Sequence, residues 1–176
     1  LLRRDALEAA GGFAAIRGAI IDDCALARAV RDGARPEGGR LWLGLTDRAW
    51  SLRRYATLES VWRMVSRSAY TQLRYSPLAL AGTLAGMALL YLVAPASLLS
   101  APLHSNAALA ALGALGWALM AVAIAPTLRL YRQPVVTGLA LPLAALLYSA
   151  MTFDSALAHM TGRRHSWRGR ATAVAG

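Results

Sequence analysis

The sequence predicts an α/β segment, followed by an amphipathic helix and an all-α membrane region of about three hydrophobic helices. Three observations lead to this prediction. Residues 1–55 alternate helical apolar spacing, glycine turns and a short apolar run, and residues 56–75 repeat apolar side chains at helical spacing. No charged side chain occurs between Arg74 and Arg129. Because a long uncharged apolar stretch of this kind belongs in lipid, we expect a soluble segment joined to a membrane anchor.

The soluble segment contains signals for two helices and one strand. Residues 4–10 have helical spacing, and the glycines at 11–12 are typical of a helix C-cap. A second helix is predicted over 22–30, because its two leading acids suit a first turn. The glycines at 38–39 are typical of a turn before a short strand over 40–45. Residues 1–55 are therefore predicted to be an α/β fragment.

Residues 56–75 have the pattern of a helix lying in the membrane interface. Three arginines, Arg63, Arg67 and Arg74, alternate with an apolar face. The apolar positions of that face are Leu58, Val61, Trp62, Val65 and Ala69. The alternative is an ordinary surface helix of the soluble segment.

The membrane region is predicted to cover residues 76–160. Its hydrophobic segments are residues 76–99, 107–128 and 135–153. The first two are long enough to cross a hydrocarbon core of about 30 Å at a rise of about 1.5 Å per residue. The third is slightly short and contains a glycine and a proline. Gly82 and Gly86 match the small-xxx-small pattern of closely packed membrane helices.

The arginines predict the orientation of these segments. The loop at residues 95–106 has no arginine, so the positive-inside rule assigns it to the outside and Arg74 and Arg129 to the inside. Three complete spans would then place the arginine-rich tail, residues 161–176, outside. Either the tail breaks the rule, or the third segment is re-entrant and returns the tail to the cytoplasm, which we favour.

Composition excludes several classes of function. The chain has 176 residues, 57% of them hydrophobic, and a formal net charge of +10 in which every basic residue is arginine. No compact basic patch is interleaved with aromatic residues, so we expect no nucleic-acid partner and assign the basic excess to a membrane surface. Cys24 is alone and cannot form an intrachain disulfide, and three scattered histidines predict no metal site in this chain.

Asp22 and Asp23 are the main catalytic candidates. An acid pair at a helix start is commonly a cap, which is one interpretation here. The surrounding sequence also resembles family-two glycosyltransferases with the GT-A fold. In those enzymes an arginine-bearing helix ends in Gly-Gly-Phe, and a following acid pair opens the next helix with a leucine three residues beyond the second acid. The corresponding residues are Gly11, Gly12, Phe13, Asp22, Asp23 and Leu26.

The resemblance implies that residues 1–55 are the C-terminal part of a GT-A domain that performs an inverting sugar transfer. Asp23 matches the carboxylate that takes the proton of the acceptor hydroxyl, with Asp22 beside it. The family also has a Gln/Arg-x-x-Arg-Trp element that helps to bind the leaving diphosphate. Residues 72–75 depart from it, being one residue short and ending in tyrosine. The substrate-binding residues so implied are Gly11, Gly12, Arg67, Tyr70, Gln72 and Arg74.

Further segments resemble the hopanoid-biosynthesis-associated glycosyltransferases of bacteria. They are residues 22–26, 42–46, 62–65, 70–77, 151–157 and 167–170. The tail is also similar to that of ceramide glucosyltransferases, which lies on the cytoplasmic side. The resemblance implies a multi-pass protein of the bacterial inner membrane with a cytoplasmic catalytic part. It implies a nucleotide-sugar donor and a lipid-type acceptor linked to hopanoid or isoprenoid metabolism.

The donor-binding half of that family and its Asp-x-Asp metal motif are absent from this sequence. We therefore expect the chain to be the C-terminal portion of a longer enzyme, inactive alone, whose magnesium or manganese ion is held by residues outside this chain. The alternative is a non-catalytic membrane anchor or scaffold with a small cytoplasmic α/β module, in which Arg67 and Arg74 anchor membrane phosphates. A transporter is disfavoured, because Asp154 is the only acidic residue near the hydrophobic segments.

Overall fold

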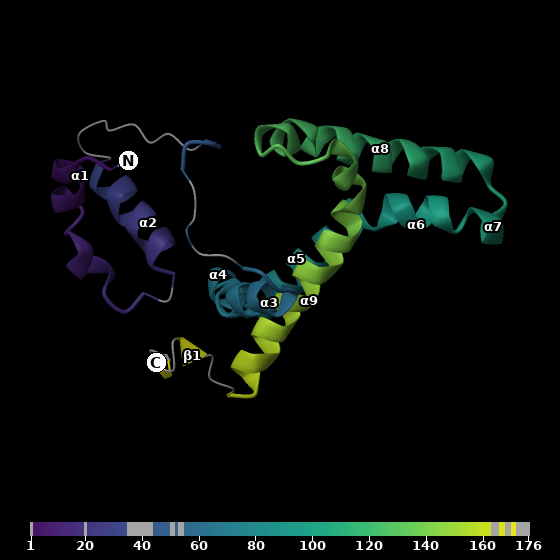
Figure 1. Cartoon of the computed structure of the whole chain (residues 1–176). Coiled ribbons are helices and arrows are strands. Elements are labelled where there is room, and N and C mark those ends of the chain that lie inside the picture. Colours follow the sequence, from purple (N-terminus) through teal and green to yellow (C-terminus); the bar gives the residue numbers. More distant parts are fainter. Residues whose placement is uncertain are drawn as a thin grey trace. The chain divides into compact units, whose positions relative to one another are not determined.

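The computed structural model describes residues 2–19, 21–34, 44–49, 52, 55–162, 166–167 and 170–171 (Figure 1). The chain divides into two compact units. The first comprises Leu1–Leu45 with Trp167–Gly176, and the second comprises Thr46–Ser166. Each unit is described by itself below.

The first unit is built from three helical elements. These are α1 (Arg4–Ala9), the 3-10 helix η1 (Phe13–Ile16) and α2 (Asp22–Ala34). α2 packs against both α1 and η1, and Val30 on α2 is buried. A Cβ atom at Gly33 would lie only 3.4 Å from the carbonyl oxygen of Ala9. The end of α2 at Gly33 therefore lies beside the end of α1.

The predicted α/β character of residues 1–55 is wrong. In the part of the chain that the structure describes, strands occur only as β1 (Ser166–Trp167) and β2 (Arg170–Ala171), each two residues long. Of the strand predicted over 40–45, residues 40–43 lie outside the described residues, and residues 44 and 45 belong to no regular element. The alanine-rich, capped segments before residue 35 form helices, since alanine has the highest helix propensity.

The second unit begins with two short helices where the sequence predicts one amphipathic helix. α3 (Leu58–Ser66) starts at a capping box, in which Thr57 and Ser60 exchange side-chain and backbone hydrogen bonds. α4 (Ala69–Gln72) follows after a break at Arg67 and Ser68. Both helices pack against α9 (Leu141–Met160).

The hydrophobic helices follow in order. α5 (Pro77–Tyr91) starts at the Ser76 cap, with Pro77 in its first turn, where a missing N–H costs nothing. α6 (Val93–Leu99) continues it at an angle of 46°. α7 (Ala101–His104) leads to α8 (Ala107–Leu130), which is capped by Asn106. The 3-10 helix η2 (Val135–Ala140) then runs into α9 (Leu141–Met160).

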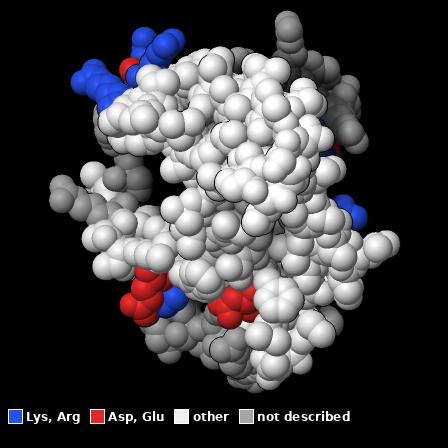
Figure 2. Space-filling view, turned by 90° about the vertical axis from the view of Figure 1, so that its right-hand side faces the viewer, with Lys and Arg blue, Asp and Glu red and all other residues white. Residues whose placement is uncertain are grey.

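Two of these elements are long and apolar enough to cross a membrane. They are Ala107–Leu130 with 24 residues and Val135–Met160 with 26 residues. The bent pair α5–α6 makes a third if it forms one broken span, and its bend also fits a re-entrant loop. Helical structure in the last element extends to Met160, beyond the predicted end of the third hydrophobic segment at residue 153. Figure 2 shows a face whose middle is made of uncharged residues, with charged side chains around its margin.

The membrane helices of the second unit contact one another through small residues. α6 lies along α8, and η2 packs on the other end of α8 (Figure 1). A Cβ atom at Gly113 would lie 2.6 Å from the Ala94 carbonyl oxygen and 2.8 Å from the Leu98 amide nitrogen. By contrast, nothing lies within 4 Å of a Cβ built at Gly82 or Gly86. Among the described residues, the close helix contact is therefore made by Gly113 and not by the small-xxx-small motif of α5.

Replacing Gly113 with alanine should lower the free energy of unfolding by about 1–3 kcal/mol, because the new methyl group overlaps the α6 backbone. Gly82→Ala is the matched control. It adds the same methyl group in open space and should raise the stability by up to about 1 kcal/mol through helix propensity. Thermal unfolding of both variants in the same detergent measures the difference. Equal melting temperatures would contradict the α6–α8 contact.

Candidate functional site

Gly11 and Gly12 form the C-cap of α1, as the sequence predicts. The Gly11 N–H donates to the Glu8 carbonyl at 3.0 Å, and the Gly12 N–H donates to the Leu7 carbonyl at 2.9 Å. This pair of bonds is the Schellman motif. Gly11 has a φ of 82° and Gly12 a φ of 65°, which glycine adopts without steric cost. Their backbone groups close α1 and turn the chain towards η1.

Asp22 and Asp23 are the first two residues of α2, and both are exposed. Asp22 Oδ1 accepts a hydrogen bond from the Asp23 N–H at 3.1 Å, and Asp23 Oδ1 accepts one from the Cys24 N–H at 2.7 Å. The positive end of the helix dipole favours carboxylates at this position. The predicted helix start is confirmed. The acids stabilise the first turn, and their exposure leaves them open to a substrate.

The glycine pair and the acid pair do not lie together in the first unit. Gly33, at the far end of α2 from Asp22, is the residue that approaches Ala9 near the end of α1. α2 has 13 residues, which corresponds to a length of about 20 Å at about 1.5 Å per residue. Gly11 and Gly12 are therefore near the C-terminal end of α2, and the acid pair is at its N-terminal end.

In the second unit, Tyr70 and Gln72 lie on α4, and Arg74 lies in the turn before α5. Arg74 and Tyr75 have φ values of 52° and 56°, a conformation that costs a non-glycine residue about 1–3 kcal/mol. Among the hydrogen bonds that hold this turn, two join Tyr70 and Tyr75: the Tyr75 N–H donates to the Tyr70 carbonyl at 3.1 Å, and the Tyr70 hydroxyl donates to the Tyr75 carbonyl at 2.8 Å. Tyr70 thus supports the strained segment that presents Arg74.

Tyr70 is also the residue that fixes α4 to α9. It is 3% exposed, and its backbone N–H donates to the Oγ of Ser155 at 3.1 Å. Ser155 is buried on α9, between Met151 and Ala158, which are buried as well. An amide in this position would carry a large desolvation cost without its acceptor. The serine hydroxyl therefore sets the position at which α4 meets α9.

An aromatic cluster extends this contact. The rings of Tyr75 and His159 are stacked, with centroids 4.3 Å apart and an interplanar angle of 18°. Tyr70 meets both rings edge-on, at 5.5 Å from His159 and 5.7 Å from Tyr75. Such arrangements are worth about 0.5–1.5 kcal/mol beyond the area they bury. The cluster joins the turn after α4 to the last turn of α9.

A polar contact between side chains joins α3 to α9. The indole Nε1 of Trp62 donates to Asp154 Oδ2 at 2.9 Å, and both side chains are half-buried. A hydrogen bond to a carboxylate is about twice as strong as one between neutral groups. Asp154 therefore anchors the amphipathic helix, and the sequence identifies it only as an acid near the third hydrophobic segment.

The remaining predicted binding residues differ in exposure. Arg67 is half-buried at the break between α3 and α4, and its Nε atom is buried. Gln72 and Arg74 are exposed. Tyr70, Gln72 and Arg74 thus lie within one short segment, which comprises α4 and the turn after it and packs against α9. Arg67 lies in the turn before α4. The acid pair and the glycine pair belong to the other unit.

The residues present do not form a metal site that the structure can identify. Within the described residues, no group of three or more histidine, cysteine, aspartate or glutamate side chains lies together. At the start of α2, the side chains that could bind a metal ion are the two carboxylates of Asp22 and Asp23 and the half-buried thiol of Cys24.

The sequence analysis did not predict that four residues of the contact with α9 belong to the site: Trp62, Tyr75, Ser155 and His159. A weak signal existed, since Ser155 and His159 lie four residues apart and so face the same side of a helix. Polar residues at that spacing near the end of an apolar helix indicate a partner helix. The sequence does not reveal which segment that partner is.

Replacing Ser155 with alanine should lower the free energy of unfolding by about 1–3 kcal/mol, because the buried Tyr70 amide loses its acceptor. Ser149→Ala, on the same helix, is the matched control and should change stability by less than about 0.5 kcal/mol. Limited proteolysis at the α4–α5 turn provides a second measurement. Equal stability and equal cleavage of the two variants would show that Ser155 does not hold α4.

Comparison with known proteins identifies the family. The sequence profile described as glycosyl transferase family 21 matches residues 1–175. No curated protein and no solved structure matches the chain. The match confirms the glycosyltransferase activity predicted from the sequence, in family 21 and not in family two. Since it covers both units, the chain belongs to glycosyl transferase family 21 and is a glycosyltransferase.

Proposed function

We propose that this glycosyltransferase acts at a membrane, where it transfers a sugar from a nucleotide-sugar donor to the hydroxyl of a lipid acceptor with inversion at the anomeric carbon. One observation carries the proposal. The family match runs without interruption through the exposed acid pair at the start of α2 and through the two elements long enough to span a membrane. A transferase with such helices is suited to an acceptor that lies in the bilayer.

In the proposed reaction the acceptor oxygen attacks the anomeric carbon, and the bond from that carbon to the diphosphate oxygen breaks. Asp23 takes the hydroxyl proton, and the nucleoside diphosphate leaves with the bonding electrons. A carboxylate can act as this base only if it reaches the acceptor, and Asp23 is exposed at its helix end. Asp22, its neighbour, adds negative charge beside the reacting hydroxyl. Gly11 and Gly12 lie near the C-terminal end of α2, so in this proposal they contact a part of the substrate away from the hydroxyl that Asp23 deprotonates.

In the second unit, the binding residues that the resemblance implies are Arg67, Tyr70, Gln72 and Arg74. Arg74, on its strained turn, and Arg67 offer cationic groups beside α9, where a diphosphate or lipid phosphate can be bound. Gln72 adds an exposed amide on the same segment, and Tyr70 holds that segment in place. Positive charge close to the leaving oxygens stabilises the transition state of such a transfer.

For the acceptor we propose a hydroxylated lipid of the hopanoid or isoprenoid class, in a bacterial inner membrane with the catalytic unit in the cytoplasm. The support is the resemblance of segments such as residues 62–65, 70–77 and 151–157 to hopanoid-associated enzymes. Residues 62–65 lie on α3 and residues 151–157 on α9, and α3, α4 and α5 each pack against α9.

The test uses the full-length protein, including any residues before Leu1, in liposomes. Release of nucleoside diphosphate is followed with several nucleotide sugars, with and without a hydroxylated hopanoid, a polyprenol or a ceramide. Asp23→Asn should lower kcat by about 10²–10⁴-fold, because asparagine keeps an oxygen for the Cys24 N–H but cannot take a proton. Asp32→Asn is the matched control, since it removes a carboxylate from the opposite end of α2, and it should leave kcat unchanged.

Two results would count against the proposal. Full turnover in Asp23→Asn, with melting temperature unchanged, would assign Asp23 a capping role only. Turnover that is the same with and without every lipid would contradict a lipid acceptor while leaving the glycosyltransferase activity in place.

A further inference from the structure

A pocket of about 380 Å³ lies between the C-terminal half of α8 and η2, away from the contact of α3 and α4 with α9. Seven of its eight lining residues are uncharged and apolar: Ala121, Val122, Ala125, Pro126, Val135, Val136 and Leu139. The eighth is Arg129, in the last turn of α8. Its volume is within the range of about 300–1,000 Å³ that is usual for small-molecule sites.

The two walls are joined by close packing beside the pocket. Gly138 is buried against α8, where an added Cβ would lie 2.9 Å from Ile124 Cγ2 and 3.1 Å from the Ala121 carbonyl oxygen. Val122 and Val136, on opposite walls, are 66% and 68% exposed, so one side opens outward. Because both elements are candidate membrane spans, the open side faces lipid.

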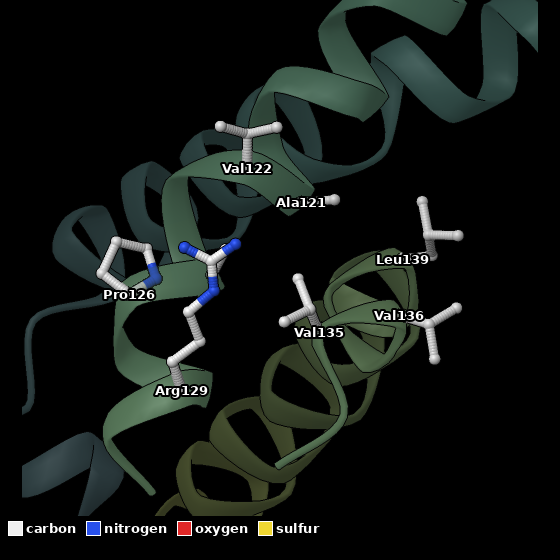
Figure 3. Close-up of a pocket in the computed structure, with 8 residues that line it drawn as sticks. Ala121, Val122, Pro126, Arg129, Val135, Val136 and Leu139 are labelled. Carbon is white, nitrogen blue, oxygen red and sulfur yellow. The ribbon is translucent and has the colours of Figure 1, made fainter. Parts of the chain in front are cut away.

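Arg129 is the unusual component of this apolar site. Figure 3 shows its side chain running from the last turn of α8 into the space between Pro126 and Val135. A side chain on a helix leans towards the N-terminus, which here is the direction of the membrane core. A guanidinium placed beside hydrocarbon is costly unless an anion neutralises it.

The chain has few acids near Arg129 that could supply that anion. No aspartate or glutamate occurs between Glu59 and Asp154 in the sequence. Asp154 lies in the second half of α9, where it accepts the hydrogen bond of Trp62. Among the residues that the structure describes, no carboxylate is paired with Arg129. An anion from outside the protein suits the site.

We propose that this pocket binds one anionic phospholipid of the surrounding bilayer, with its phosphodiester on Arg129 and one acyl chain along the apolar walls. A planar guanidinium offers a phosphate two parallel hydrogen bonds. The arginines at 129 and 132 assign this end of α8 to the cytoplasmic leaflet by the positive-inside rule, and anionic lipids are enriched there. The lipid would join α8 to η2 and so stabilise the contact between the two candidate spans, Ala107–Leu130 and Val135–Met160.

The site is tested with the full-length protein in nanodiscs made from equimolar phosphatidylcholine and phosphatidylglycerol. Native mass spectrometry after release from the disc measures which lipid stays bound. The wild type should retain phosphatidylglycerol in preference to phosphatidylcholine. Arg129→Gln should lower this retention about tenfold, equivalent to about 1.4 kcal/mol of binding free energy.

Two control variants separate the pocket from general surface charge. Arg132→Gln removes the same charge three residues further on, outside the pocket lining, and should retain phosphatidylglycerol like the wild type. Val136→Trp keeps the charge but fills the exposed side of the pocket, and should lower retention as Arg129→Gln does. Phosphatidylglycerol should also raise the melting temperature of the wild type more than that of Arg129→Gln.

Three outcomes would overturn the proposal: equal retention by Arg129→Gln and Arg132→Gln, unchanged retention by Val136→Trp, or retention of phosphatidylcholine as strongly as phosphatidylglycerol. These measurements do not depend on sugar transfer. A failed lipid site would therefore leave the proposed transferase reaction untouched, and a failed reaction would leave the lipid site untouched.

Discussion

The contact of α3 and α4 with the C-terminal half of α9 is the interaction on which the second unit depends. It joins segments more than eighty residues apart in the sequence through two hydrogen bonds, Trp62 to Asp154 and Tyr70 to Ser155. Both bonds involve groups removed wholly or partly from water, so losing a partner is costlier than at the surface. Without this contact the arginine-bearing turn after α4 would have no fixed position beside the last membrane helix.

The apolar helices supply the frame for this contact. In lipid every backbone N–H and carbonyl must be paired within the protein, which leaves helices as the stable form of an uncharged segment. Their association cannot rely on the hydrophobic effect, so close approach of small residues replaces it. Gly113 at the α6–α8 crossing and Gly138 at the α8–η2 crossing serve this purpose. The pocket lined by Arg129 is the space left beside the second crossing (Figure 3).

Local signals in the sequence predicted the helix ends well. The Gly11–Gly12 cap and the start of α2 at Asp22 follow from short-range chemistry, which the sequence carries directly. The α/β assignment failed because it depended on a strand over 40–45 and on the fold that the resemblance implied. The single helix predicted over 56–75 is interrupted at Arg67 and Ser68, and the segment after the interruption is bonded to α9 through the Tyr70 N–H. The spacing of Ser155 and His159 indicates a shared helix face, but the segment that packs on this face is set by three-dimensional packing and has no local signature.

The most direct test of this account is a double-mutant cycle on Trp62 and Asp154. Trp62→Phe, Asp154→Ala and the double variant are compared with the wild type in thermal unfolding in one detergent. The account predicts a coupling energy of about 1.5–3 kcal/mol, because the indole N–H is bonded to a half-buried carboxylate. Additivity of the two single effects within about 0.5 kcal/mol would show that α3 is not held on α9 by this bond.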